Sequence, residues 1–156
     1  MNIAERLLAI EEIKQLKARY FRLMDQKDWA GLADLFAEDA VCDYRGALRD
    51  PSDGPAPPDD PYEIDVVGRE AIVRFIQAGL TGVRSVHHGH MPEIDIQSDD
   101  EARGIFAMYD GLSFRQGPLS ALDGYGHYYD GFRRIDGRWQ IATLRLVRLR
   151  VDTVAA

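Results

Sequence analysis

The stretch GYGHYYDGFRRIDGRWQI, from Gly124 to Ile141, decides the fold class. Aromatic-rich runs on either side meet at Asp136-Gly137, a dipeptide typical of a tight turn between two strands. Other turn residues, such as Ser98-Asp99-Asp100, separate further strand-like segments in the second half of the chain. The predicted strands are 83–91, 93–98, 102–113, 124–134 and 138–151. We therefore expect a run of antiparallel strands after residue 83.

The first half has helical periodicity instead. Asn2 and Glu5 have the spacing of a capping box. Apolar residues then recur every three or four positions to about Met24, which predicts a long amphipathic helix. The residues of this apolar face are Leu7, Ile10, Ile13, Leu16, Tyr20 and Met24. A second, shorter helix is predicted from Asp28, with its apolar side formed by Trp29, Leu32, Leu35 and Phe36. A short strand is expected at Val41–Tyr44 and a third helix from Gly68 to Leu80.

Five of the seven prolines lie between Pro51 and Pro61, in a segment also rich in Asp and Gly. This composition predicts a long irregular loop at about residues 46–62, and such loops commonly serve as lids or binding loops. Helices followed by antiparallel strands predict one α+β domain over residues 1–156. In it, three helices pack on one face of a strongly curved, mixed or antiparallel sheet. The concave space between the layers is a natural pocket.

Composition excludes several classes of function. With 19 Lys and Arg against 26 Asp and Glu, the net charge of −7 disfavours a nucleic-acid partner. No apolar run approaches the roughly 20 residues that span a bilayer, so we expect no membrane partner. The charged amphipathic start argues against a secretory signal, and the single Cys42 is compatible with a reducing compartment. We expect a cytoplasmic protein.

Six strings in order resemble SnoaL-like domains of the NTF2-like superfamily, over about residues 6 to 152. They are IKQLKARY (Ile13–Tyr20), LFAEDAV (Leu35–Val41), VHHGHMPEI (Val86–Ile94), ARGIFAMYD (Ala102–Asp110), GYGHYYDGFRRIDGRWQI (Gly124–Ile141) and LVRLRVD (Leu146–Asp152). The resemblance implies an NTF2-like cone enclosing a pocket, no cofactor, and a homo-oligomer, either dimer or trimer, formed through the outer face of the sheet. The superfamily includes dehydratases, isomerases, cyclases, dehydrohalogenases and plain binding proteins, so the fold leaves the chemistry open.

The nearest resemblance, to bile-acid 7α-dehydratases, implies a catalytic site of five residues: Tyr20, Asp25, His87, Asp110 and Arg148. His87 would be the general base, Asp25 its orienting partner and Tyr20 a donor to the reacting oxygen. The hexachlorocyclohexane dehydrochlorinases also resemble the chain at Asp25 and His87 but carry a lysine in place of Tyr20. Scytalone dehydratase has a histidine in place of Asp110.

The roles of Asp110 and Arg148 have more than one interpretation. Asp110 could act as a second acid or bind a substrate hydroxyl. Arg148 could hold a carboxylate or thioester carbonyl, or pair with Asp110. Strand alternation puts Asp110 at the end of the apolar face of Gly104, Phe106 and Met108, and Arg148 at the end of the face of Leu144 and Leu146. Buried charges need partners, so the two suggest the polar floor of one pocket, or a purely structural ion pair.

Helix geometry limits the first two site residues. Residues five apart on an ideal helix point roughly 140° away from each other. Tyr20 and Asp25 can therefore share a pocket only if Asp25 lies at or past the helix end. Tyr20 could also be plain core, Asp25 a surface residue and His87 a structural histidine.

The histidines invite a metal interpretation, which we reject. His88 and His90 would share a strand face, with His127 a possible third ligand, but nothing completes the usual set of three or four. His90, Tyr125 and His127 are instead expected to line the pocket or strand edges. No GxGxxG or GxxxxGK string suggests a nucleotide. We expect neither a metal nor another cofactor.

The sequence thus favours a cofactor-independent lyase of the dehydratase type, or an isomerase. Its expected substrate is a small hydrophobic molecule with a hydroxyl or keto group, steroid-like or polyketide-like, and the proline-rich loop would cover the pocket. Two alternatives stay open: a non-catalytic binding or oligomerisation domain, and a ketosteroid-isomerase-like enzyme with Asp110 as the base.

Overall fold

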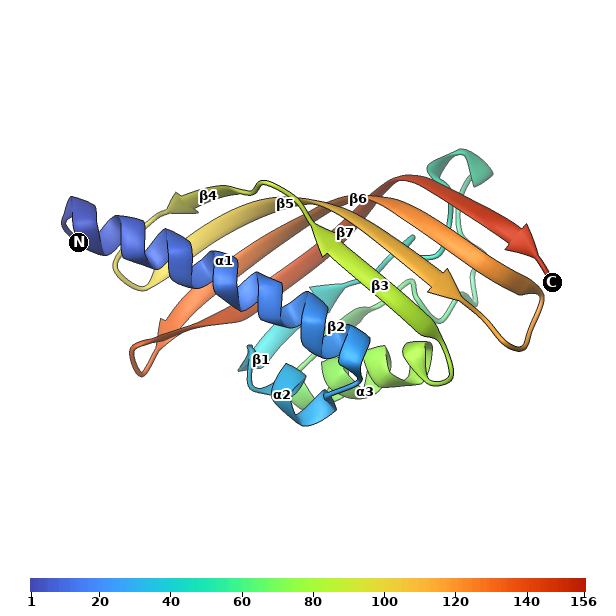
Figure 1. Ribbon diagram of the computed structural model, residues 1–156, viewed down its shortest axis with the longest axis horizontal. Coiled ribbons are helices and arrows are strands. Elements are labelled where there is room, and N and C mark those ends of the chain that lie inside the picture. Colours follow the sequence, from blue (N-terminus) through green and yellow to red (C-terminus); the bar gives the residue numbers. More distant parts are fainter.

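A computed structural model describes residues 1–156 as three helices packed on a seven-stranded sheet (Figure 1). The helices are α1 (Ile3–Gln26), α2 (Trp29–Ala33) and α3 (Arg69–Leu80). The strands are β1 (Phe36–Asp43), β2 (Asp65–Val67), β3 (Arg84–Gly89), β4 (Glu93–Ile96), β5 (Glu101–Ser113), β6 (Leu119–Ile135) and β7 (Arg138–Ala155). The predicted α+β class and its helices-then-strands order are confirmed.

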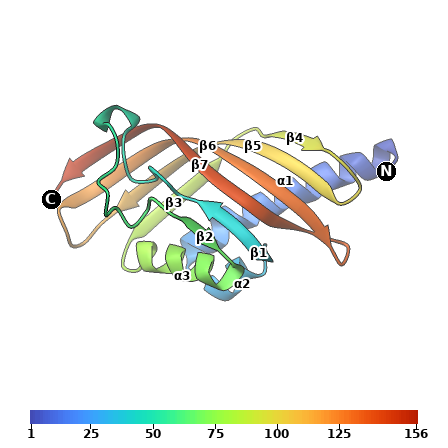
Figure 2. The same cartoon turned by 180° about the vertical axis from the view of Figure 1, so that it is seen from behind.

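The sheet is mixed, and it curves without closing into a barrel. Its order is β2-β1-β7-β6-β5-β3, with β4 pairing beside β3 along β5. Only the β1–β7 pair is parallel. The β6–β7 hairpin turns at Asp136-Gly137, where both residues have positive φ, as the tight turn predicted there requires. In Figure 1, α1 crosses the sheet while α2 and α3 lie together at the lower edge, near the middle of the molecule, and Figure 2 shows β1 and β7 from the other side.

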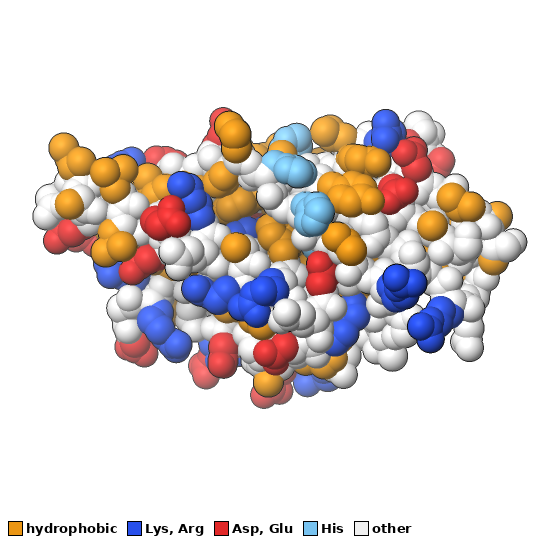
Figure 3. Space-filling view, viewed as in Figure 1, with side chains coloured by type: hydrophobic (Ala, Val, Ile, Leu, Met, Phe, Trp, Pro, Cys, Tyr) orange, Lys and Arg blue, Asp and Glu red, His pale blue; other side chains and the backbone are white.

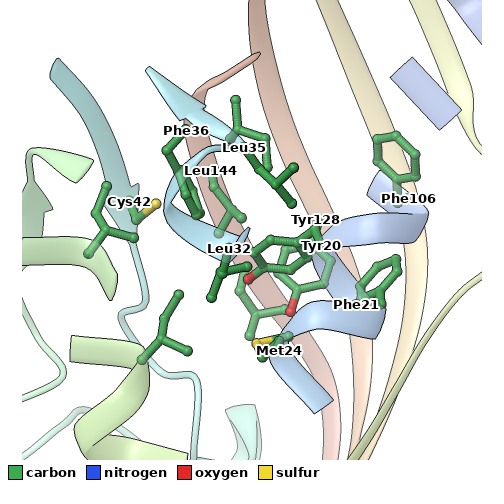
Figure 4. Close-up of a cluster of buried hydrophobic side chains, with 14 of the residues drawn as sticks. Tyr20, Phe21, Met24, Leu32, Leu35, Phe36, Cys42, Phe106, Tyr128 and Leu144 are labelled. Atoms are coloured by element: carbon green, nitrogen blue, oxygen red, sulfur yellow. The ribbon is translucent and has the colours of Figure 1, made fainter. Parts of the chain in front are cut away.

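The core lies between the helices and the concave face of the sheet (Figure 4). The stripe that α1 buries runs through Ala9, Ile13, Leu16, Tyr20 and Met24. It meets alternate residues of β5 and β6, because every second side chain of a strand points to the same face. The apolar face of the helix, with its 3.6-residue period, therefore packs against the apolar face of the strands, with its two-residue period. None of the helices is long and apolar enough to cross a membrane.

Several element boundaries differ from those predicted. Leu7 is 62% exposed because it lies off the stripe of α1 that faces the sheet, although Ala9 in the same turn is buried. Hydrophobic side chains also reach the surface over this end of the molecule (Figure 3). The second helix ends at Ala33, and Phe36 opens β1 instead of closing that helix. Strand β2 was not predicted, and β6 and β7 are longer than predicted since they pair beyond the core. The proline-rich loop contains one short 3-10 turn, Pro51–Asp53.

Replacing two apolar residues of α1 tests this packing. Ile13 is fully buried, so Ile13→Ala should lower the free energy of unfolding by about 2–5 kcal/mol through lost burial and a cavity. Leu7→Ala, on the exposed part of the same helix, should change it by less than about 0.5 kcal/mol. Urea unfolding of both variants measures the difference, and equal losses would contradict the placement of α1.

Candidate active site

Asp25 lies in the last turn of α1 and connects that helix to β3. The helix ends immediately after it, with Lys27 in the left-handed conformation. Oδ1 of Asp25 accepts a hydrogen bond from Ser85 Oγ (2.9 Å) and contacts His87 Nδ1 (2.6 Å). Oδ2 of Asp25 accepts a hydrogen bond from the His87 backbone N–H (2.7 Å). A carboxylate at a helix C-terminus opposes the helix dipole, so these contacts offset an unfavourable position.

The contacts to Asp25 fix the tautomer of His87. Burial raises the pKa of Asp25, but hydrogen bonds from His87 more than compensate, and the pKa falls below its ordinary value. An ionised carboxylate only accepts hydrogen bonds, so Nδ1 of His87 carries the proton that points at Asp25. In the neutral imidazole, Nε2 is then free to accept a proton. This nitrogen faces the interior, 3.9 Å from Asp110 Oδ2.

Asp110 and Arg148 form a buried ion pair that bridges β5 and β7. The guanidinium donates to both carboxylate oxygens, Nη1 to Oδ1 at 2.6 Å and Nη2 to Oδ2 at 2.9 Å. Arg148 Nε also donates to the carbonyl of Ala47 (2.7 Å), in the loop after β1. The pair passes over β6 at Gly124, where a Cβ would collide with both charged groups. The ion pair that the sequence offered as one interpretation of these two residues is therefore present.

These groups meet at a cavity of about 150 Å³ beneath the helices. Its polar wall contains six side chains: Tyr20, Tyr44, His87, Asp110, Tyr128 and Arg148. Apolar side chains of α3 and of the sheet form much of the rest, including Phe75, Ile76, Leu80, Leu112 and Leu146. The proline-rich loop and its approaches add Ala47, Leu48 and Tyr62, so this loop does line the cavity.

Three tyrosine hydroxyls form one end of this polar wall. Burial raises the pKa of Tyr20 and of Tyr44 well above the ordinary value, and it also raises the pKa of Tyr128. All three phenols are therefore neutral and can donate hydrogen bonds. In Figure 4, the hydroxyl oxygens of Tyr20 and Tyr128 lie on the side of Met24, away from Phe106. The Tyr44 hydroxyl is buried beside the side chains of Tyr20 and Cys42.

Four of the five predicted site residues line this one cavity, and the fifth lies behind it. Asp25 does not line the cavity and is connected to it through its contact with His87.

The other histidines lie elsewhere. His88 and His90 border a surface groove beside α1, where histidines gather in Figure 3, and His127 packs near Tyr129 on β6. His90, Tyr125 and His127 do not line the cavity, which rules out the first of the two positions expected for them. No three His, Cys, Asp or Glu side chains converge as metal ligands would.

Tyr44 and Tyr128 were missed as site residues. Tyr128 lies on the inward face of β6, two residues from Gly126 and four from Gly124, but an aromatic residue on a buried face normally reads as core. Tyr44 follows the end of β1, where strand alternation gives no guide to orientation. Only the curvature of the sheet brings the two hydroxyls beside Tyr20.

A family model described as a SnoaL-like domain matches residues 5–145. The chain belongs to the SnoaL-like family. Solved structures agree with this SnoaL-like fold. A candidate scytalone dehydratase from Novosphingobium aromaticivorans is 21% identical, with 97% of this chain and 91% of that one covered and a TM-score of 0.79. A hexachlorocyclohexane dehydrochlorinase, LinA type 2, is 17% identical, with 99% and 95% covered and a TM-score of 0.80. A protein of unknown function from Mycobacterium tuberculosis, Rv3472, is 26% identical, with 95% and 76% covered and a TM-score of 0.74.

The tautomer of His87 in this SnoaL-like site is directly testable. In Asp25→Asn, the side-chain carbonyl can keep the bond from the His87 backbone N–H only if the amide NH₂ faces Nδ1 and Ser85. We expect the neutral ring to switch to the Nε2–H tautomer, as seen in ¹⁵N NMR spectra assigned with His87→Gln. Ser85→Ala removes one bond to the carboxylate but should leave the tautomer unchanged. An unchanged tautomer in Asp25→Asn would show that Asp25 does not orient the ring.

Proposed function

We propose that this SnoaL-like protein is a cofactor-independent lyase of the dehydratase type or an isomerase, with His87 as the general base. One observation carries the proposal: His87 Nδ1 contacts Asp25 at 2.6 Å, while Nε2 is directed toward a cavity that Tyr20, Tyr44 and Tyr128 also line. A base opposite neutral donors suits removal of a proton next to a carbonyl. The dehydratase and dehydrochlorinase among the solved neighbours are named for eliminations, which supports a lyase-type role.

The mechanism follows from these positions. Nε2 of His87 takes a proton from the carbon next to the substrate carbonyl, and the C–H electrons move onto the carbonyl oxygen. The hydroxyl of Tyr20, with Tyr44 and Tyr128 nearby, donates to the resulting enolate oxygen. In a dehydration, the enolate expels a β-hydroxyl, which leaves as water with the proton returned from Nε2. In an isomerisation, the same proton returns to a different carbon.

Asp110 is better placed to stabilise the imidazolium than to act as the base. Each of its oxygens accepts a hydrogen bond from Arg148, so one lone pair on each oxygen is already engaged by the guanidinium. Its Oδ2 lies 3.9 Å from His87 Nε2, the nitrogen that becomes positively charged after proton transfer. The arrangement favours His87 over the alternative in which Asp110 removes the proton.

The cavity limits the size of the substrate. A volume of about 150 Å³ matches apolar cavities that hold one benzene-sized ring, whereas drug-sized ligands occupy roughly 300–1,000 Å³. A one-ring hydroxy ketone fits the cavity in this form. A steroid-like or polyketide-like molecule requires the wall formed by Ala47, Leu48 and Tyr62 to move outward.

A one-ring β-hydroxy ketone, 3-hydroxycyclohexanone, tests the proposal. We expect the protein to form cyclohexenone, followed by ultraviolet absorbance, and to exchange the protons next to the carbonyl with D₂O, followed by NMR. His87→Gln should slow both reactions by roughly 10²- to 10⁴-fold, the usual contribution of a general base. Tyr20→Phe should slow them by about 10²-fold, through loss of an oxyanion donor. His88→Gln replaces the exposed histidine next to His87 and should leave both rates unchanged.

Two results would overturn this assignment. Activity that survives in His87→Gln but is lost in Asp110→Asn would make Asp110 the base. Thermal unfolding must show that Asp110→Asn still folds, because this variant leaves Arg148 without its charged partner. If the protein binds the ketone without exchange or elimination, it is the non-catalytic binding domain.

A further inference from the structure

A second buried ion pair lies directly behind the tyrosines of the cavity. Lys17 of α1 and Asp130 of β6 meet at 2.7 Å, and their side chains are 1% and 0% exposed. The Lys17 ammonium lies 3.8 Å from the ring centroid of Tyr128 and 4.2 Å from that of Tyr20. Phe21 and Phe106 complete an aromatic enclosure at 5.3 and 5.6 Å. Neither charged residue lines the cavity.

Stability alone does not account for this pair. Burial lowers the pKa of Lys17 and raises that of Asp130, and their mutual attraction opposes both changes. Buried ion pairs commonly contribute little net stability, and apolar residues of similar volume often replace them without loss. The interior around the pair is aromatic and could accept such a replacement.

The cation is instead placed to act on the two phenols. An ammonium over the face of an aromatic ring attracts the electron density of that ring. A phenol polarised in this way is a stronger hydrogen-bond donor through its hydroxyl. The rings of Tyr20 and Tyr128 present their faces to Lys17, and both residues also line the cavity. The positive charge of Lys17 therefore acts on a ligand indirectly, by polarising the phenols that contact the ligand, and Lys17 itself does not contact the ligand.

We propose that Lys17, held by Asp130, is a positioning residue that strengthens the Tyr20 and Tyr128 hydroxyls as donors to an anionic oxygen in the cavity. The inference rests on the proposed function, in which that oxygen belongs to an enolate. It adds an electrostatic component that acts through the rings and does not touch the substrate.

The test uses 4-nitrophenol, a one-ring ligand whose absorbance distinguishes its phenolate from its neutral form. Its non-ionisable counterpart is 4-nitrotoluene. The wild-type protein should bind the phenolate more tightly than 4-nitrotoluene. The double variant Lys17→Met with Asp130→Leu removes both charges and keeps apolar bulk, so it should fold. We expect it to bind the phenolate about tenfold more weakly, as loss of a desolvated cation–π contact implies, with 4-nitrotoluene binding unchanged.

A matched control separates this local effect from a change in surface charge. Lys14 and Glu11 form an exposed ion pair on the same helix. Lys14→Met with Glu11→Leu changes the charges in the same way and should leave the affinities for both ligands unchanged.

Two outcomes would overturn the inference. If the double variant of Lys17 and Asp130 binds both ligands like the wild type, or weakens both equally, the pair is only structural. If the wild type does not prefer the phenolate, the tyrosine hydroxyls are not donors to an anion in the cavity. Failure of the proposed base is detected separately, by the His87 tautomer measured without ligand.

Discussion

The carboxylate of Asp25 is the contact on which the site depends, because it joins the end of the long helix to the edge of the sheet. It accepts hydrogen bonds from both the backbone and the ring of His87, so it sets the position of β3 and the orientation of the imidazole together. Ser85 adds a third bond to the carboxylate and itself accepts from Lys27, the residue that ends α1. The turn that stops the helix and the base of the site thus belong to one hydrogen-bonded unit.

Two buried ion pairs cross the interior, and they serve different ends of the cavity. Asp110 and Arg148 border the ligand space, whereas Lys17 and Asp130 lie behind the tyrosine rings. Each pair joins elements that are far apart in the sequence, and each is almost fully enclosed. Charges in such surroundings interact strongly with nearby groups, because little water screens them. A small cavity can therefore be strongly polarised although most of its wall is apolar.

Periodicity predicted much of this architecture, and its failures have physical causes. Strand alternation brought Asp110 and Arg148 together, because each interrupts an apolar face. A charged residue on an otherwise apolar face also occurs at Asp130, between Tyr128 and Phe132, and at Lys17, on the buried stripe between Ile13 and Tyr20. Leu7 was counted on the same face as Ile13, but six residues of an α-helix put the two about 120° apart. Leu7 is exposed while Ala9, in the same turn, is buried, because only Ala9 lies on the stripe that faces the sheet. Assembly through the outer sheet face stays a prediction.

The loop after β1 is attached to the scaffold at two points on β7. Ala47 accepts a hydrogen bond from Arg148, and the Asp50 carboxylate accepts one from the backbone of Val151. Beyond Tyr44, its first residue, the loop supplies part of the cavity wall but neither the imidazole nor the phenols of Tyr20 and Tyr128. A lineage could lengthen, shorten or exchange this segment and reshape the ligand space while the proton-transfer groups stay fixed on helix and strands. Substrate preference can therefore evolve through the loop without changing the residues that carry out the reaction.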